Sequence, residues 1–226
     1  MLNLAVAAAA FVLVHLLVSG TRVRDGIVAR IGEGAYMGLF SLASIGLLVW
    51  MVSAYGPARQ ENLVWWGPEP LRHVAWLVQL LGVLLIVVGL TTPTPTSVKQ
   101  EGVLDRPDAA RGVVRITRHP FLWGVTIWAA GHLLVNGDLA SLLLFGSLLF
   151  LGALGGASID AKRIRALGEK YHEFKSVTSN VPFVAILRGR QPLRLGEMGW
   201  RLPVALLVYA LLFVAHPWFA GVSAAG

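Results

Sequence analysis

Histidine is the residue type with the most chemical potential in this sequence, because five of the six histidines stand inside or beside segments without any charged residue. These five are His15, His73, His119, His132 and His216. A neutral imidazole is a common metal ligand, and an ionisable side chain in an apolar segment is a hypothesis for a functional site. The chain contains no cysteine, which excludes disulfides, thiolate metal ligands and a cysteine nucleophile.

His119 has the most suggestive neighbours, because it stands in the segment Ile116-Thr117-Arg118-His119-Pro120. Proline is favourable at the first position of a helix, where its missing N–H would have had no partner. A helix that begins there presents free backbone N–H groups and a partial positive charge. Arg115 and Arg118 stand beside this helix end, and Trp123 adds a flat apolar wall one turn further on.

Two interpretations of this segment remain open. In the first, the helix end binds a cofactor that has carboxylates and either a metal or a planar ring. In the second, Arg118 and His119 only anchor the helix at the membrane interface by extending towards the headgroups.

The elements that must position these histidines are membrane-spanning helices. Only 14% of the 226 residues are charged and 56% are hydrophobic, whereas soluble domains carry about 25% charge. Six windows contain no Asp, Glu, Lys or Arg, and each is about as long as the roughly 17–25 apolar residues that cross a bilayer as a helix. The sequence therefore predicts an all-α integral membrane protein, a single domain over residues 1–226, with six transmembrane helices at about 2–18, 35–54, 73–90, 120–135, 139–158 and 202–220.

The positive charges predict the orientation. Three, five and nine basic residues lie in the first, third and fifth loops, against only Arg59 and Arg72 in the two alternate loops. The positive-inside rule places the basic loops in the cytoplasm and both termini in the periplasm of a bacterial inner membrane. The net charge of +7 is then an orientation signal and indicates no nucleic-acid partner. His15 and His119 fall at the cytoplasmic depth, whereas His73, His132 and His216 fall in the outer half, where their role stays open.

Local patterns predict how the spans pack. Gly34–Gly38 and Gly152–Gly156 have the spacing that allows close helix approach, and Asn136-Gly137-Asp138 predicts a tight turn between the fourth and fifth spans. Residues 159–175 predict an amphipathic cytoplasmic helix between spans five and six, lying on the membrane surface or capping a cavity. An aromatic belt is expected at the outer boundary from Trp50, Trp65, Trp66, Trp76 and Trp218.

The sequence resembles the NnrU family, which is known from denitrification gene clusters and includes zeta-carotene isomerases. The resemblance covers most of the chain and is carried by three stretches, Arg118-His119-Pro120, Trp123-Gly124 and Trp128-Ala129-Ala130-Gly131-His132-Leu133-Leu134-Val135-Asn136-Gly137-Asp138.

The NnrU resemblance implies an inner-membrane protein that binds haem b through two histidines, which would be His15 and His119 here. The haem propionates would meet Arg115, Arg118 or the start of the fourth span. The implied function is an isomerase or redox protein acting on a lipid-soluble substrate, with the haem iron acting on a polyene. An accessory role beside respiratory nitrogen-oxide reductase components is an alternative that rests on the family's genomic setting.

A second, wider resemblance is to the isoprenylcysteine carboxyl methyltransferase-like superfamily. It rests on Arg118-His119-Pro120, the hairpin that follows, and the stretch Leu167-Gly168-Glu169-Lys170-Tyr171-His172-Glu173-Phe174. It implies an S-adenosylmethionine-dependent membrane methyltransferase in which His119 and Tyr171 line the cofactor pocket. Asp160 stands alone where those methyltransferases carry an acidic pair.

Overall fold

The computed structural model describes residues 1–58, 62–65 and 67–224. In these ranges the regular elements are helical, apart from an isolated antiparallel bridge between Leu63 and Asp138. Arg59 and Trp66, which enter the predicted topology and the aromatic belt, lie outside the described residues.

The long helices are α1 (Leu2–Leu13), α3 (Glu33–Ala58), α4 (Glu69–Thr91), α5 (Pro120–Val135), α6 (Leu139–Leu167) and α9 (Arg201–Ala220). Shorter α-helices are α2 (Arg22–Ile31), α7 (Glu169–Val177) and α8 (Val184–Leu187). A π-helical turn, η1 (Val14–Ser19), extends α1, and the 3₁₀ turns are η2 (Glu101–Asp105), η3 (Gly112–Arg115) and η4 (Leu195–Met198).

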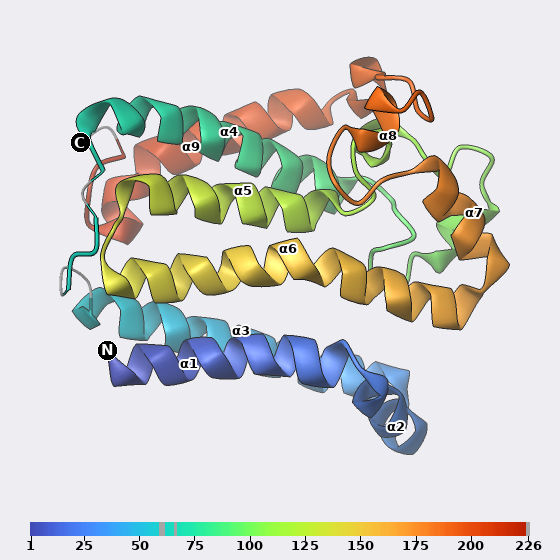
Figure 1. Ribbon diagram of the computed structural model, residues 1–226, viewed down its shortest axis with the longest axis horizontal. Helices are drawn as coiled ribbons and strands as arrows, with labels where there is room; N and C mark the ends of the chain where they lie inside the picture. The colour runs from blue at the N-terminus through green and yellow to red at the C-terminus, as the bar shows by residue number, and fades with distance from the viewer. Residues whose placement is uncertain (59–61, 66, 225–226) are drawn as a thin grey trace.

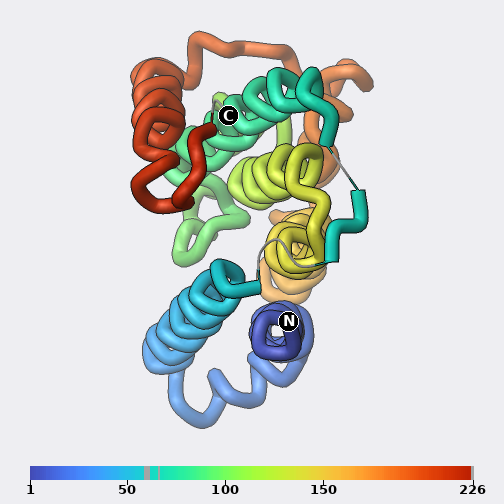
Figure 2. Tube along the Cα trace, turned by 90° about the vertical axis from the view of Figure 1, so that its left-hand side faces the viewer, coloured from blue at the N-terminus to red at the C-terminus, as the bar shows by residue number. Residues whose placement is uncertain are grey.

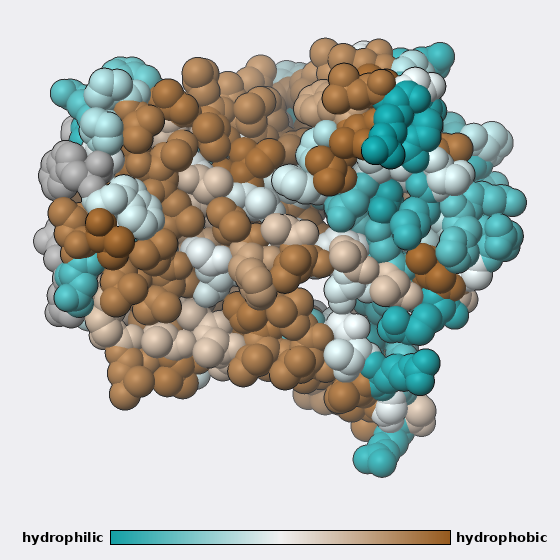
Figure 3. Space-filling view, viewed as in Figure 1, coloured by the Kyte–Doolittle hydropathy of each residue, from teal (hydrophilic) through white to brown (hydrophobic). Residues whose placement is uncertain are grey.

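The long helices lie side by side, with α6 in the middle (Figures 1 and 2). On one side α6 packs against α5, which in turn contacts α4, and α4 contacts α9. On the other side α6 packs against α1 and α3. Both termini lie at one end of the bundle, and α2, α7 and α8 lie at the other (Figure 1). The second end carries most of the hydrophilic surface (Figure 3) and is called the basic end below.

The lengths and compositions of the helices are those of a membrane protein. Among the described residues, five helical segments are long and apolar enough to cross a bilayer: Leu2–Ser19, Glu33–Ala58, Glu69–Thr91, Leu139–Leu167 and Arg201–Ala220. The sixth predicted span, α5, has 16 residues and a length of about 24 Å, which is shorter than the roughly 30 Å of a hydrocarbon core. The structure thus supports the all-helical membrane architecture, while the count of six crossings stays a prediction.

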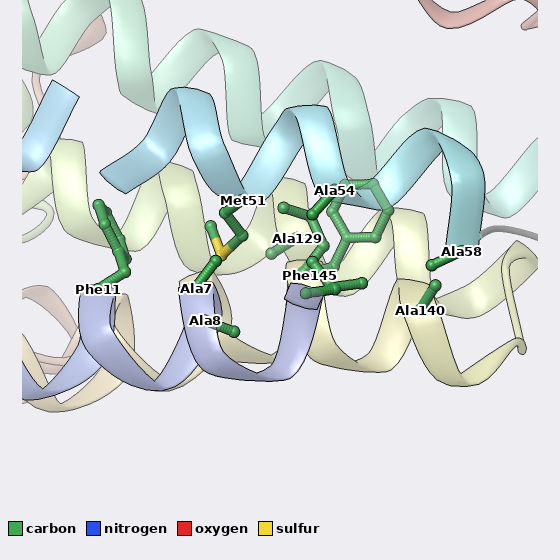
Figure 4. Close-up of a cluster of buried hydrophobic side chains, with 11 residues drawn as sticks. Ala7, Ala8, Phe11, Met51, Ala54, Ala58, Ala129, Ala140 and Phe145 are labelled. Atoms are coloured by element: carbon green, nitrogen blue, oxygen red, sulfur yellow. The ribbon is translucent and has the colours of Figure 1, made fainter. Parts of the chain in front are cut away.

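A core of small and aromatic side chains joins the two sides of the bundle. The cluster includes Phe11 of α1, Met51 of α3, Ala129 of α5 and Phe145 of α6 (Figure 4). Alanines make up much of the rest of the buried cluster, and larger side chains such as Trp128 pack against it. This core fixes the direction in which α1 approaches the basic end, and with it the position of His15.

Glycines bring α4, α5 and α6 together. A Cβ atom on Gly152 would lie 2.3 Å from Thr126 Oγ1 of α5, so the predicted close approach at Gly152–Gly156 is confirmed. A Cβ on Gly124 of α5 would lie 2.6 Å from the backbone nitrogen of Ile86 of α4. The corresponding prediction for Gly34–Gly38 is wrong, because a Cβ at either position would meet no atom within 4 Å.

The turn between α5 and α6 is confirmed as well. The Asp138 carboxylate caps α6 by accepting hydrogen bonds from the backbone N–H of Ser141 at 2.9 Å and from its hydroxyl at 2.6 Å. A Cβ on Gly137 would lie only 2.0 Å from the carbonyl oxygen of Trp65, so glycine is required where that strand-like segment crosses the turn.

The predicted amphipathic helix over 159–175 is correct in part. α6 continues to Leu167, the chain turns at Gly168 with φ +56°, and the separate helix α7 follows. Tyr171 and Phe174 of α7 are buried against Val114, so this face packs on protein and not on the membrane surface. The reason is that the segment 91–118 folds back over α7 and offers it an apolar surface.

Candidate functional site

The Asp160 carboxylate is the centre of a buried polar network at the basic end. The Arg118 guanidinium donates to both carboxylate oxygens, from Nε at 3.0 and 3.1 Å and from Nη2 to Oδ2 at 2.5 Å. His119 Nε2 lies 2.8 Å from Oδ1, and the Tyr171 hydroxyl donates to the same oxygen at 2.6 Å. All four residues are at most 5% exposed, so protein atoms surround the network.

The four members come from three parts of the chain, the start of α5, the end of α6 and α7, and local structure positions each of them. Pro120 begins α5, which makes His119 the residue that caps the helix. On α6, Gly156 leaves the space that His119 occupies, because a Cβ there would lie 3.0 Å from His119 Cδ2. Asp160 follows one turn later on the same face of α6, and the turn at Gly168 directs Tyr171 of α7 back towards it.

The backbone around Arg118 is also held on both sides. Its N–H donates to the carbonyl of Ser179 at 2.9 Å, and its carbonyl accepts from the Thr96 hydroxyl at 2.7 Å. The Thr117 hydroxyl donates to the carbonyl of Asn180 at 2.5 Å. Segments that are more than 60 residues apart in sequence therefore fix one short stretch of backbone, which makes the network rigid.

Burial and charge determine the protonation states at the edge of the membrane. Burial, and then the hydrogen bond to Asp160, raise the pKa of Tyr171 above its ordinary value, so the phenol remains protonated and donates. Burial lowers the pKa of His119, although the Asp160 carboxylate pulls it in the opposite direction. His119 is therefore neutral at physiological pH, and its Nε2–H donates to Asp160.

Arg115, predicted to meet a cofactor, lies elsewhere. It forms a bidentate ion pair with Glu197 at 2.9 and 3.0 Å and donates to Gln191 at 2.6 Å. The Arg115 hydrogen bonds lower the pKa of Glu197 to about 2. This pair ties η3 to η4 and leaves Arg115 outside the Asp160 network.

Trp123 lies beside the network, because its indole N–H donates to the side-chain oxygen of Asn180 at 3.2 Å. Together with Gly156, Asn180 closes the side of the site that faces α6. Two side chains of the predicted anion site, Arg118 and His119, contact the Asp160 carboxylate.

His15 has a different environment. It lies in the π-helical turn η1, and such turns often occur at functional sites. Its Nδ1 lies 2.8 Å from the Phe11 carbonyl, so the proton is on Nδ1 and Nε2 carries the lone pair. The nearest polar atom to Nε2 is the Ser44 hydroxyl oxygen, at 3.5 Å. The ring is framed by Phe11 and Phe40.

Comparison with known proteins assigns the family. The sequence model described as "NnrU protein" matches residues 3–224. The chain belongs to the NnrU family. It is 30% identical over 230 residues to the chloroplastic 15-cis-zeta-carotene isomerase of Arabidopsis thaliana, covering 94% of this chain and 59% of that protein. It is 26% identical over 197 residues to the isomerase of the same name from Zea mays, covering 83% of this chain and 52% of that protein.

The NnrU protein thus spans a little more than half the length of these curated relatives. No solved structure matches it.

The structure of this NnrU protein does not bring His15 and His119 together. His119 packs on the face of α6 that carries Gly156, whereas Ser158 of α6 faces Gly20, directly after η1. Two residues correspond to about 200° around a helix, so α6 lies between His119 and the end of η1. Figures 1 and 2 agree, since α6 separates α5 from α1 in both views.

The donor atoms test whether the two histidines suit a haem. His15 suits an axial ligand, because a backbone carbonyl orients its ring and the Nε2 lone pair is available. His119 Nε2 is hydrogen-bonded to Asp160, so only Nδ1 of that ring could bind a metal in this arrangement. Because α6 lies between the two histidines, they do not form a bis-histidine site here. Within the described ranges no group of three or more His, Asp or Glu side chains could hold a metal ion.

The three outer histidines have separate partners. His132 Nδ1 lies 2.5 Å from the Gln79 amide nitrogen, and its ring stacks on Phe145 with a centroid distance of 4.3 Å. His216 contacts the carbonyl of Val222 at 2.7 Å, and His73 packs edge-on against Trp76. These contacts are those of packing residues at the α4–α5–α6 and α4–α9 sides of the bundle.

Sequence reasoning missed the central role of Asp160 and the roles of Thr96 and Asn180. A signal for Asp160 exists, because it is the first carboxylate after the charge-free window that ends at residue 159. A carboxylate at that depth needs a cation, and Arg118 is at the matching depth of the preceding span. Thr96 and Asn180 give no such signal, since both lie in irregular segments.

Proposed function

We propose that this NnrU protein isomerises a cis double bond of a lipid-soluble polyene related to 15-cis-zeta-carotene. The observation that carries the proposal is its similarity, over 83% and 94% of its length, to two proteins named 15-cis-zeta-carotene isomerase. The protein covers only part of those relatives, so its substrate is inferred from the shared membrane domain.

An apolar groove between α1 and α6 supports a long hydrocarbon as the substrate. The groove has a volume of about 350 Å³, which suits a segment of a polyene. It is lined by Ala5, Ala8, Ala9, Val12, Leu13, Leu143 and Ser147. The surface is open between these two helices (Figure 3), and a hydrocarbon dissolved in the membrane can enter without crossing water.

Along α1, His15 follows this groove towards the basic end, but it is not among the residues that line the groove. Its ring contacts Phe40 and its Nε2 lies nearest to the hydroxyl of Ser44, both on α3. The second groove, between α4 and α9, is lined by apolar side chains and by Tyr209.

Activity on 15-cis-zeta-carotene in liposomes, kept in the dark, tests the proposal. We expect the purified protein to convert the cis isomer, as separated by chromatography, and Ala9→Phe to reduce the rate about tenfold or more by displacing the substrate. Ala210→Phe, which fills the α4–α9 groove instead, is the matched control and should retain the rate. An inactive wild-type protein, or equal losses in both variants, would refute the proposal.

Haem b is a second part of the proposal and has its own test. The Nε2 lone pair of His15 supports its binding, whereas only Nδ1 of His119 could serve as a ligand. If haem b is bound through His15 and not His119, the Soret absorbance of the purified protein is lost in His15→Ala and retained in His119→Gln. A band that disappears in both variants would support the paired ligands, and a protein that remains colourless after hemin addition would exclude haem.

Methyl transfer from S-adenosylmethionine has less support. Arg118, His119 and Tyr171, the side chains expected to hold that cofactor, are hydrogen-bonded to Asp160. Calorimetric binding of S-adenosylmethionine that is abolished in Tyr171→Ala would restore this alternative.

Location in a bacterial inner membrane, with both termini in the periplasm, is proposed from the basic loops. Reporter fusions at the two ends test this orientation. The alternative of an accessory role with nitrogen-oxide reductase components predicts impaired nitrite or nitric oxide reduction in a deletion strain.

A further inference from the structure

Two polar groups without a partner lie near the junction of η1, α2, α3 and α6 at the basic end. The Tyr36 hydroxyl is buried and makes no hydrogen bond within the described part of the chain. The Lys162 ammonium forms no hydrogen bond or ion pair with any described residue, although Lys162 is only partly buried. A buried donor without an acceptor is destabilising by about 1–3 kcal/mol, so the Tyr36 hydroxyl indicates an acceptor that the described residues do not provide.

Arg24 connects the two groups. Its guanidinium carbon lies 5.5 Å from the centroid of the Tyr36 ring. Arg24 and Arg163 are close enough to Lys162 to repel its charge, and the carboxylates of Asp25 and Glu101 are close enough to attract it. Gly20 packs against Ser158 of α6, and Lys162 follows Ser158 by one turn on the same face, so Lys162 lies alongside the start of α2. Tyr36, Arg24 and Lys162 therefore form one cluster, called the junction cluster below.

The donors of the junction cluster suit an oxyanion. A phenol O–H, an ammonium and a guanidinium are all hydrogen-bond donors, and the last two carry positive charge. Arg24 also contacts Asp25 at 3.3 Å and Glu33 at 2.7 Å. The side chains of these carboxylates are 50% and 60% exposed, so such pairs are weak and leave other Arg24 donors available. Arg163 does not join, since it is paired with Glu101 and the Ser97 carbonyl.

The surroundings favour a lipid over a free anion. Tyr36 stacks on Phe40, with ring centroids 5.8 Å apart and planes inclined by 20°. Directly beyond them α3 presents an apolar surface to the membrane, with Leu39 61% and Leu42 70% exposed. Gly34 and Gly38 leave open space on the same helix. A headgroup at the cluster would thus have its acyl chains along α3, within the hydrocarbon core.

We propose that the junction cluster binds the phosphate of an anionic phospholipid through Lys162, Tyr36 and Arg24, with the acyl chains lying on α3. Basic sites between helices at one face of a membrane protein recognise lipid headgroups in this way. The bound lipid supplies the acceptor that Tyr36 lacks and joins α2 and α3 to α6, on the side where the protein's own contacts are few.

Thermal unfolding of the purified full chain in neutral detergent tests the proposal. Dioleoyl phosphatidylglycerol should raise Tm with saturation, whereas dioleoyl phosphatidylcholine and inorganic phosphate should not. We expect Lys162→Gln to weaken the apparent affinity for phosphatidylglycerol about tenfold or more, and Tyr36→Phe to weaken it about threefold to tenfold. Arg188→Gln removes an exposed charge at the same end of the protein and is the matched control.

Three results would overturn the proposal. Lys162→Gln and Arg188→Gln with equal phosphatidylglycerol responses would mean that net charge alone attracts the lipid. Equal effects of inorganic phosphate would indicate a free-anion site. If phosphatidylglycerol raised the Tm of the Tyr36→Phe variant as much as that of the wild type, the Tyr36 hydroxyl would not bind the lipid. This variant loses only one oxygen atom, so we expect it to fold.

Discussion

The two sides of the bundle differ in how closely their helices approach. Around α4, α5 and α6, glycines bring backbones into contact, and the Asp160 carboxylate accepts from Arg118, His119 and Tyr171. Around α1, α2 and α3, glycines face open space, the buried Tyr36 hydroxyl has no hydrogen-bond partner among the described residues, and His15 Nε2 has the Ser44 hydroxyl at 3.5 Å. The first side is therefore the more closely packed, and the second leaves more room beside its helices.

The largest expected effect concerns helix packing. Gly124→Leu should prevent folding or reduce the free energy of unfolding by more than about 4 kcal/mol, because the new side chain meets the backbone of α4. Gly38→Leu places the same side chain on α3 in open space and should leave stability unchanged or slightly higher. Size-exclusion profiles and thermal unfolding in detergent measure both. Similar losses at both positions would end the distinction between the two sides.

The next effect concerns carboxylates on the two sides. Asp160→Asn leaves the Arg118 charge buried without a counter-charge and should reduce stability by about 3–5 kcal/mol. Glu33→Gln breaks an exposed ion pair with Arg24 and should change stability by less than about 1 kcal/mol. Chemical unfolding monitored by tryptophan fluorescence compares the variants. A small loss of stability in the Asp160→Asn variant would show that the network contributes little to stability.

A pair of identical substitutions sharpens the comparison. Tyr171→Phe removes a hydrogen bond to Asp160 and should reduce stability by about 1–3 kcal/mol. Tyr36→Phe removes an unpartnered hydroxyl and should be neutral or stabilising in lipid-free protein. Both are measured by thermal unfolding after delipidation. Equal destabilisation by the two changes would contradict the finding that the Tyr171 hydroxyl is hydrogen-bonded and the Tyr36 hydroxyl is not.

The smallest effect is a dependence on pH. The pKa of His119 is lowered on folding by burial, so the unfolded chain binds a proton that the folded chain does not as pH falls below about 6.5. His119 therefore contributes stability that is complete above that value and is lost as pH falls towards the folded pKa. Tm measured from pH 8 to 5 should decline less in His119→Gln than in wild type, and the exposed His172→Gln should follow the wild type.

Particular residues show how far sequence reasoning reaches. The charge-free windows predicted each long helix to within a few residues at most ends, because a membrane excludes charges locally along the chain. The end of the fifth span is an exception, since α6 continues nine residues further, to Leu167. α6 remains helical beyond the end of its apolar segment, and its charged last turns pair with the segments at the basic end.

For the candidate site, sequence reasoning singled out the Arg118-His119-Pro120 segment but did not find the partners of its side chains. Arg118, His119 and Tyr171, which were predicted to bind a cofactor, form hydrogen bonds to the Asp160 carboxylate. The two glycine pairs illustrate the same limit, since Gly34–Gly38 and Gly152–Gly156 have equal spacing and opposite surroundings.

The sequence by itself determined the apolar spans, the basic end, the turn at Asn136-Gly137-Asp138 and the NnrU resemblance, because these depend on residue types that are close together along the chain. Only the tertiary structure decided which face of each helix meets another helix. That choice placed His119 beside Asp160 and placed α6 between His119 and the end of η1. The choice of packing face depends on contacts between residues that are far apart in sequence. No local sequence pattern determines the free energies of those contacts.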